Sequence, residues 1–380
     1  MNWLVIFYSV ILLLLSFDVK FINKISTSRV NKLIYAFPII AGLISWSCDV
    51  LTRESRVSSI YNADNEIVNN QFQINFDFLP DISSSDESIH LEKTPVATSL
   101  KSYALVTGAS RGIGRSIAIS LARRRFNLIL VAKDHKRLEA FATELHESYG
   151  VSVVTISKDL SADNAAQEIF QITQDKGLEV DILMSNAGMC RVGDVLDMSV
   201  DMITYLTRLN FESVVQLSNL FGNEMKLRRK GRIVIISSLT GSVMGVPTAA
   251  VYAANKAGLN SFSASFGKEM EAHAVPVTLI IPGAVTNTNF SKMAQMEKAF
   301  IWDFPIGILT PEIVAESTVQ AMIAGKREVV IGWLNVIMAR IVNHLLPKSW
   351  ILTLCELSFN PFVINWKNKR KTPHEDAKEL

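Results

Sequence analysis

The sequence predicts an α/β fold in which a doubly wound parallel sheet is covered by helices on both faces. From Tyr103 onward, seven short apolar runs alternate with stretches of helical periodicity. Each run is apolar at nearly every position, which is typical of parallel strands that are buried on both faces. The alternation continues over roughly 230 residues, a length that a single domain of this class can hold.

In chain order, the strands are expected at YALVT (103–107), NLILVA (127–132), VSVVTIS (151–157), VDILMS (180–185), GRIVIIS (231–237), PVTLIIP (276–282) and EVVIG (328–332). The helices between them are expected over 112–125, 134–149, 162–176, 202–229, 249–273 and 311–324. Seven strands joined by six crossovers predict a Rossmann-like sheet.

The chain begins with an apolar run of 15 residues (3–17), close to the roughly 17 residues that the shortest spanning helices need. Only Met1 and Asn2 precede the run, whereas four basic residues follow between Lys20 and Lys32. This asymmetry predicts an uncleaved anchor with the downstream chain on the cytosolic side. A cleaved signal peptide is the alternative.

A second apolar stretch (33–51) contains Pro38 and Gly42. It fits a second span, a re-entrant segment or a helix in the membrane interface, and the sequence does not choose among them. A second span would place the sheet domain on the opposite side of the membrane. We therefore assign residues 1–51 to a membrane anchor of one or two spans.

The other segments differ in composition from the sheet domain, which we assign to 101–332. Residues 52–100 are rich in Asn, Ser, Asp and Glu, which predicts a polar linker with little fixed structure. Residues 333–380 form an apolar extension that ends in a basic cluster, Lys367, Lys369, Arg370 and Lys371. This pattern favours an amphipathic segment resting on a bilayer. The alternative is a cap on the core or on a homodimer interface.

Composition argues against two classes of function. The net charge is +2, from 38 basic and 36 acidic residues, so no electrostatic case for nucleic-acid binding exists. The three cysteines (Cys48, Cys190 and Cys355) have no CxxC spacing, and no HExxH motif occurs. We therefore expect free thiols and no metal site.

A glycine-rich segment follows the first strand and opens a helix: TGASRGIG (107–114). Gly108 permits a tight turn, Gly112 lets the backbone approach a pyrophosphate, and Gly114 lets helix and strand pack closely. The TGxxxGxG spacing resembles that of the short-chain dehydrogenase/reductase family and differs from GxGxxG. The segment therefore predicts a dinucleotide site, to which Ser110, Arg111 and Ile113 also belong.

The end of the second strand indicates which dinucleotide is bound. An acidic residue at this position binds the ribose 2′-hydroxyl in NAD enzymes. Here the strand ends with Ala132 and Lys133, and Arg111 lies in the glycine-rich segment. Two cations near the 2′ position favour the extra phosphate of NADP(H). Asp134, one residue later, argues against NADP(H), because it is an acidic residue close to the position that binds the ribose hydroxyl in NAD enzymes.

The family resemblance implies contacts at the ends of the third and fourth strands. Asp159 and Leu160 match the position that contacts the adenine ring. Asn186, Ala187 and Gly188 match the family's NAG motif. For Asn186 the resemblance implies a partly structural role in the sheet.

The predicted chemistry centres on YAANK (252–256), where Tyr252 and Lys256 lie one helical turn apart on the same face. A free tyrosine titrates near pH 10, too high for proton transfer at neutral pH. A lysine ammonium one turn away, together with an oxidised nicotinamide, favours the phenolate and lowers that pKa. Tyr252 is therefore the predicted acid/base.

The resemblance covers roughly residues 103–332 and implies further roles. It implies that Lys256 also holds the nicotinamide ribose, that Ser238 binds the substrate oxygen, and that Asn210 orders a water that relays protons to Lys256. It places the nicotinamide pocket at Ile281, Pro282, Gly283 and Thr286.

The serine departs from the family spacing by one residue. Ser238 precedes Tyr252 by 14 residues, and Leu239 occupies the more usual position. We infer a one-residue insertion in the loop 242–248 and assign Ser238 to the site. Ser237 is the alternative, although a structural role at the strand end suits it better.

The segment 291–309 is strongly apolar and takes the position of the family's substrate lid. A helix that merely packs on the domain is the simpler interpretation. Combined with an anchor, the segment predicts reduction of a lipophilic carbonyl substrate in lipid metabolism, such as a 3-oxoacyl derivative, a keto-sphingoid base, a sterol or a retinoid. Resemblance to membrane-bound relatives implies the endoplasmic reticulum, with the catalytic domain facing the cytosol. The alternative function is a non-catalytic NADP(H)-binding sensor or scaffold.

Overall fold

The computed structural model describes residues 102–243, 245–288, 290–296, 308–342 and 346–359. The predicted anchor (1–51), the polar linker (52–100), most of the lid segment and the basic end of the extension lie outside these residues. Within the described part of the chain, no helix is both long and apolar enough to cross a membrane.

Seven strands form one parallel sheet in the order β3-β2-β1-β4-β5-β6-β7. They are β1 (Ser102–Thr107), β2 (Asn127–Ala132), β3 (Val153–Ser157), β4 (Glu179–Ser185), β5 (Arg232–Ile236), β6 (Val277–Ile281) and β7 (Glu328–Val330). The direction in which strands are added reverses beside β1. A crevice therefore opens between the carboxyl ends of β1 and β4.

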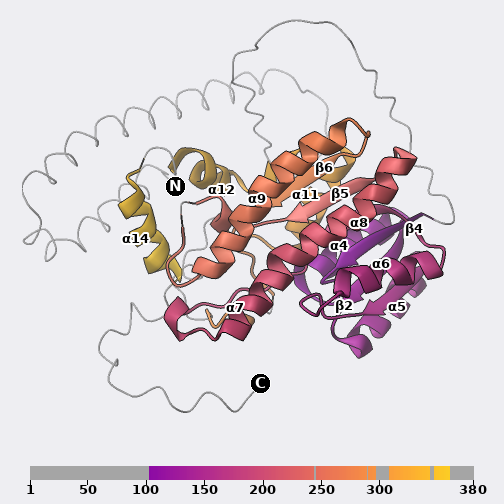
Figure 1. The fold of residues 1–380 in the computed structure, drawn as a ribbon, viewed down its shortest axis with the longest axis horizontal. Coiled ribbons are helices and arrows are strands. Elements are labelled where there is room, and N and C mark those ends of the chain that lie inside the picture. The colour runs from indigo at the N-terminus through magenta and orange to yellow at the C-terminus, as the bar shows by residue number, and fades with distance from the viewer. Residues whose placement is uncertain (1–101, 244, 289, 297–307, 343–345, 360–380) are drawn as a thin grey trace, which may run out of the picture. The chain divides into compact units, whose positions relative to one another are not determined.

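The described helices connect the strands and continue past the last one (Figure 1). The α-helices are α4 (Gly112–Arg123), α5 (His135–Tyr149), α6 (Ala165–Asp175), α7 (Val200–Thr207), α8 (Ser213–Arg228), α9 (Ala250–Glu271), α10 (Phe290–Met293), α11 (Pro311–Ile323), α12 (Trp333–Ile337) and α14 (Lys348–Phe359). Single turns of 3-10 helix are η1 (Val195–Asp197) and η3 (Leu239–Gly241), and π-helical turns are η2 (Arg208–Glu212) and η5 (Met338–Val342).

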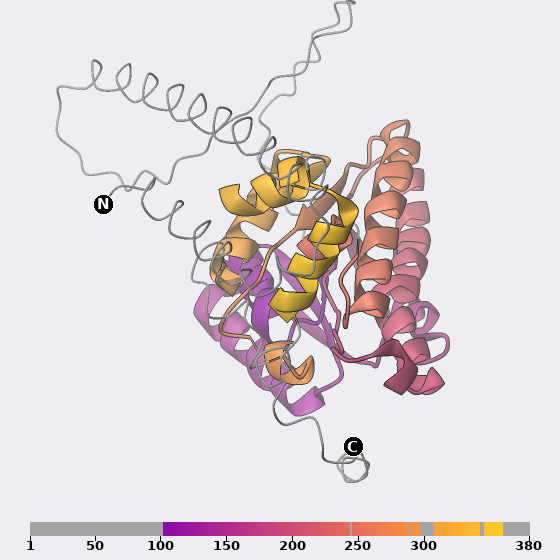
Figure 2. The ribbon, with the colours of Figure 1, turned by 90° about the vertical axis from the view of Figure 1, so that its left-hand side faces the viewer.

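Two helix layers cover the sheet, as Figure 2 shows. Helices α4, α5 and α11 pack on one face, where Leu121 and Val319 are fully buried. Helices α6, α8 and α9 pack on the other, where Phe170 meets Phe221 edge to face at 5.2 Å. Burial of each large apolar side chain contributes about 1.5–3 kcal/mol, so these two layers hold the strand ends in place.

The predicted doubly wound sheet of seven strands is confirmed, and each expected strand is present. The expected single helix over 202–229 is wrong in one respect, because a π-helical turn (η2) interrupts it between α7 and α8. Asn210 in this turn uses its amide nitrogen to donate to Leu206 O and Met189 O, each at 2.8 Å. Such turns often occur at functional sites, and this one turns Asn210 toward the carboxyl end of β4.

Candidate active site

The glycine-rich segment packs directly against the end of β4. A side chain at Gly108 (φ +65°) would place its Cβ 2.9 Å from Asn186 Nδ2, and one at Gly114 would place it 2.5 Å from the same atom. Only glycine therefore allows this close approach. At Gly112 (φ +50°) the nearest atom to a Cβ would be Thr288 Cγ2, at 3.2 Å. Together these glycines leave a backbone cradle at the N-terminus of α4.

Asn186 fastens the two strand ends together. Its amide nitrogen donates to Thr107 O at 2.9 Å, and its backbone N–H and that of Ala187 donate to Thr107 Oγ1 at 2.9 and 3.0 Å. The partly structural role implied for Asn186 agrees with these contacts. Gly188 continues the turn, and a Cβ there would lie 2.9 Å from Asn210 Oδ1 and 3.6 Å from Lys256 Nζ.

The two cations assigned to the 2′ position have different partners. Arg111 approaches Asp134 at 3.3 Å, while Lys133 forms an ion pair with Asp159 at 3.0 Å and lies 5.4 Å from the Tyr205 ring centre. Asp159 also accepts hydrogen bonds from the backbone N–H and the hydroxyl of Ser161. Burial alone would raise the pKa of Asp159, but the hydrogen bonds from Ser161 and Lys133 outweigh burial and lower it. Lys133 is thus held toward the end of β3, where the neighbouring Leu160 is buried.

Tyr252 and Lys256 come together at the start of α9. The Lys256 ammonium lies 5.7 Å from the centre of the Tyr252 ring and donates to Ile236 O at 2.8 Å. Both side chains are almost fully buried, with 7% and 3% of their surface exposed. Asn210 is buried nearby and accepts from Met189 N at 2.9 Å. The predicted polar residues therefore gather between the ends of β4 and β5.

Burial sets the protonation of this group. It raises the pKa of the Tyr252 phenol, and a hydrogen bond with Ser238 acts against that rise. The expected lowering of this pKa is therefore not produced by these side chains, because desolvation of the phenolate is the larger effect. Burial also lowers the pKa of Lys256 to about 8 and raises that of the adjacent Cys190 thiol to about 12.

The structure distinguishes the two serines at the end of β5. Ser237 is buried, and its hydroxyl donates to Lys256 O at 3.1 Å and meets Asn260 Oδ1 at 2.5 Å, which ties β5 to α9. Ser238 caps η3 by accepting from Thr240 N at 3.2 Å, and its hydroxyl acts to lower the pKa of the Tyr252 phenol. Of the two, Ser238 is thus the serine beside the phenol.

The loop after β6 contains a contact that the sequence did not reveal. Pro282 O accepts from Leu239 N at 2.9 Å, and Thr286 N donates to Leu309 O at 2.9 Å. Asn335, on α12, packs closely against Gly283. A Cβ added to Gly283 would lie only 2.5 Å from Asn335 Oδ1. The extension that begins at residue 333 therefore supports this loop. The one signal in the sequence was a lone amide within an apolar run.

Apolar side chains from four segments surround the phenol. Cys190, Val246, Ala294 and Met296 form a buried cluster with Tyr252, and Phe290, Cys355 and Phe359 pack against it. The Phe290 ring centre lies 5.8 Å from that of Tyr252. Cys355 and Phe359 come from α14, so the extension also reaches the site, a contact that no local pattern could have indicated.

Comparison with known proteins places this arrangement in a family. The sequence profile of short chain dehydrogenases matches residues 102–298. The very-long-chain 3-oxoacyl-CoA reductase of Macaca fascicularis is 30% identical over 271 residues, which cover 70% of this chain and 81% of that protein. The 17-beta-hydroxysteroid dehydrogenase type 3 of Homo sapiens is 34% identical over 194 residues, covering 50% of this chain and 60% of that protein.

A solved structure has the same fold. The short-chain dehydrogenase from Sphingobium yanoikuyae in complex with NADPH superposes with a TM-score of 0.55 at 26% identity, covering 60% of this chain and 86% of that one. The chain therefore belongs to the short-chain dehydrogenase family of oxidoreductases.

Proposed function

We propose that this protein uses NADPH to reduce a carbonyl group on a lipophilic substrate at a membrane, and catalyses the reverse oxidation of the secondary alcohol. The observation that carries the proposal is the buried group at the end of β5. There the Lys256 ammonium lies 5.7 Å from the centre of the Tyr252 ring, and Ser238 acts to lower the pKa of the phenol.

The residues at the ends of β1 and β2 fit NADP(H). The three glycines leave room for a pyrophosphate at the N-terminus of α4, whose unpaired N–H groups favour an anion. The 2′-phosphate would lie at the end of β2, beside Arg111. The structure of the Sphingobium relative, which is in complex with NADPH, supports the same choice.

When bound, NADPH supplies a hydride for the carbonyl carbon. In the proposed reaction Tyr252 Oη donates its proton to the carbonyl oxygen, and the product is an alcohol. Ser238 would bind that oxygen and orient it, and the Lys256 ammonium would stabilise the phenolate that remains. Asn210 would hold the water that returns a proton to Lys256.

The pH profile of reduction tests the role given to Lys256. Since burial lowers its pKa to about 8 from 10.5, the ammonium is present below pH 8 and lost above it. Tyr252 and Cys190 keep their protons in this range, because burial raises both of their pKa values. We expect kcat/KM for reduction to be flat from pH 6.5 to 7.5 and to fall above about pH 8. A profile that stays flat to pH 10 would contradict this role.

The apolar cluster around Tyr252 supports a lipophilic substrate. The two relatives are named for acyl-CoA and steroid substrates. In this chain, thiol, methyl and aromatic groups surround the phenol. A long apolar chain bound here would gain about 0.8 kcal/mol for each buried methylene.

Replacing Phe359 with Ala should reduce the preference for long substrates. Phe359 packs against the Tyr252 cluster from α14, so its loss removes apolar surface that a long chain could contact. We expect kcat/KM for a long-chain 3-oxoacyl substrate to fall roughly tenfold, with little change for a short one. The measurement is NADPH oxidation across a series of chain lengths.

Glu356→Ala is the control, since Glu356 is exposed on the same helix and is not one of its apolar residues. It should leave the chain-length series unchanged. Equal losses on short and long substrates for Phe359→Ala would show that α14 acts on the fold and not on specificity.

We further propose that the protein lies at the endoplasmic-reticulum membrane with its catalytic domain in the cytosol. The extension supports contact with a membrane, because apolar residues are exposed on it, as in segments that rest on a bilayer: Trp333, Ile337, Met338, Trp350 and Leu354. A protease-protection assay on membranes carrying the tagged full chain tests it. Protection of the catalytic domain in sealed vesicles would contradict the cytosolic orientation.

A further inference from the structure

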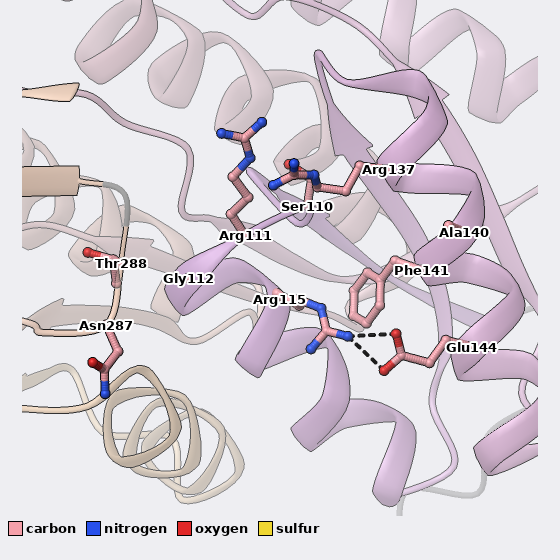
Figure 3. Close-up of a pocket in the computed structure, with 10 residues that line it drawn as sticks. All are labelled: Ser110, Arg111, Gly112, Arg115, Arg137, Ala140, Phe141, Glu144, Asn287 and Thr288. Atoms are coloured by element: carbon pink, nitrogen blue, oxygen red, sulfur yellow. Dashed lines mark hydrogen bonds and ion pairs between the residues drawn. The ribbon is translucent and has the colours of Figure 1, made fainter. Parts of the chain in front are cut away.

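A pocket of about 370 Å³ opens beside the glycine-rich segment, between α4, α5 and the loop at Thr288. Three arginines line it (Figure 3): Arg111 before α4, Arg115 in the first turn of α4 and Arg137 in the first turn of α5. Such a concentration of guanidinium groups suits a phosphate. Which of them is available depends on their partners.

Arg115 is already committed. Its guanidinium makes two hydrogen bonds to the Glu144 carboxylate, at 2.7 and 2.6 Å, and lies 4.4 Å from the centre of the Phe141 ring. Figure 3 shows this pair at the opposite end of the pocket from the other two arginines. The charge of Arg115 is therefore balanced within the protein.

Arg111 and Arg137 share one carboxylate. Asp134 lies 3.3 Å from Arg111 Nη2 and 3.5 Å from Arg137 Nε, and it also accepts from Arg137 N at 3.1 Å as the N-cap of α5. Two guanidinium groups against one carboxylate leave one positive charge. In Figure 3 both groups point to the same end of the pocket, beside Ser110.

Lys133 contributes no such surplus, because its ammonium forms the ion pair with Asp159. Among the residues that line the pocket, the unbalanced positive charge therefore belongs to the two arginines. We infer that Arg137, together with Arg111, binds the 2′-phosphate of NADP(H), and that Asp134 positions both guanidinium groups instead of binding a ribose hydroxyl. This inference rests on the NADP(H) dependence proposed above and adds to it a residue that selects the phosphate.

Asp134 is central to the inference, since an acidic residue near this position normally selects NAD. Here its oxygens accept from the α5 backbone and face two cations. A carboxylate held in this way orients the two arginines that bind the phosphate. An acidic residue at this position thus favours NADP(H) in this chain, although it normally favours NAD.

The test is to measure dissociation constants of NADPH and NADH for the full chain by fluorescence titration. Arg137→Gln should weaken NADPH binding about tenfold or more through loss of a charge-assisted hydrogen bond, and leave NADH binding unchanged. Arg115→Gln is the matched control and should keep the wild-type NADPH/NADH ratio. Asp134→Asn should leave NADH binding unchanged, which a carboxylate bound to the ribose would not allow.

The unchanged NADH affinity also serves as the folding check, and Arg137 is half exposed, so its replacement buries no new group. A wild-type NADPH/NADH ratio in Arg137→Gln would overturn the inference and leave the proposed function intact. A wild-type protein that binds both cofactors equally would overturn the proposed cofactor as well.

Discussion

Replacing Tyr252 with Phe is expected to lower kcat for carbonyl reduction about 10³-fold or more, the scale at which a well-placed general acid contributes. The substitution removes one hydroxyl from a ring that is buried against Phe290 and the surrounding apolar cluster. The ring and its packing are retained, but the variant has no hydroxyl proton to donate to the substrate oxygen.

The measurement is NADPH oxidation with a lipophilic ketone, together with NADPH titration and thermal unfolding of the same variant. Cofactor affinity should stay within about twofold of wild type, because the glycine cradle does not involve the phenol. Tyr149→Phe, at the end of α5 on the other face of the sheet, is the matched control and should retain full turnover. Undiminished reduction by Tyr252→Phe would refute the role of Tyr252 as the proton donor. A wild-type protein that binds NADPH but reduces no ketone would favour the non-catalytic sensor.

The sheet could be predicted from sequence because its determinants are local. Buried parallel strands require nearly continuous apolar runs, so NLILVA fixes β2 to the residue. The glycine cradle could also be predicted from sequence, because its backbone requires glycine. Gly108 and Gly112 take positive φ values, and Gly114 permits a close approach to Asn186. The helical spacing of Tyr252 and Lys256 predicted their proximity for the same reason.

The remaining features depend on choices between partners far apart in the chain. Lys133 could have faced the 2′ position or Asp159, and only the packing of β2 beside β3 decides for Asp159. Arg137 contacts Asp134 within one helical turn, but only the long-range approach of Arg111 to the same carboxylate brings the two arginines together. The approach of α14 to Tyr252 joins residues about 100 positions apart. Local periodicity does not encode such contacts.

The pKa of Tyr252 is a further case in which sequence gave only part of the answer. The lysine one turn away was correctly expected to lie near the ring. Burial of both groups, which no spacing reveals, raises the phenol pKa and lowers that of the lysine. At neutral pH this keeps the phenol protonated, which is the state that a proton donor for reduction needs.

Gly114→Ala should produce the second large effect, a loss of NADPH affinity of roughly 10- to 100-fold, as expected from overpacking that costs about 1–3 kcal/mol. The new methyl group would meet the carbonyl oxygen of Gly108 and lie 2.5 Å from Asn186 Nδ2. Asn186 donates from that nitrogen to Thr107 O, so relief of the clash must open the junction of β1 and β4 where the pyrophosphate would bind.

Gly267→Ala separates this local effect from a general intolerance of alanine. Gly267 lies within α9, and a Cβ there would meet Val277 Cβ at an ordinary 3.5 Å. Alanine in a helix interior is favoured over glycine by about 0.5–1 kcal/mol, so this control should bind NADPH normally and unfold at the same or a higher temperature. Because neither glycine has a positive φ, the two variants differ in steric room and not in backbone strain. Wild-type NADPH affinity in Gly114→Ala would mean that the cofactor does not lie in the glycine cradle.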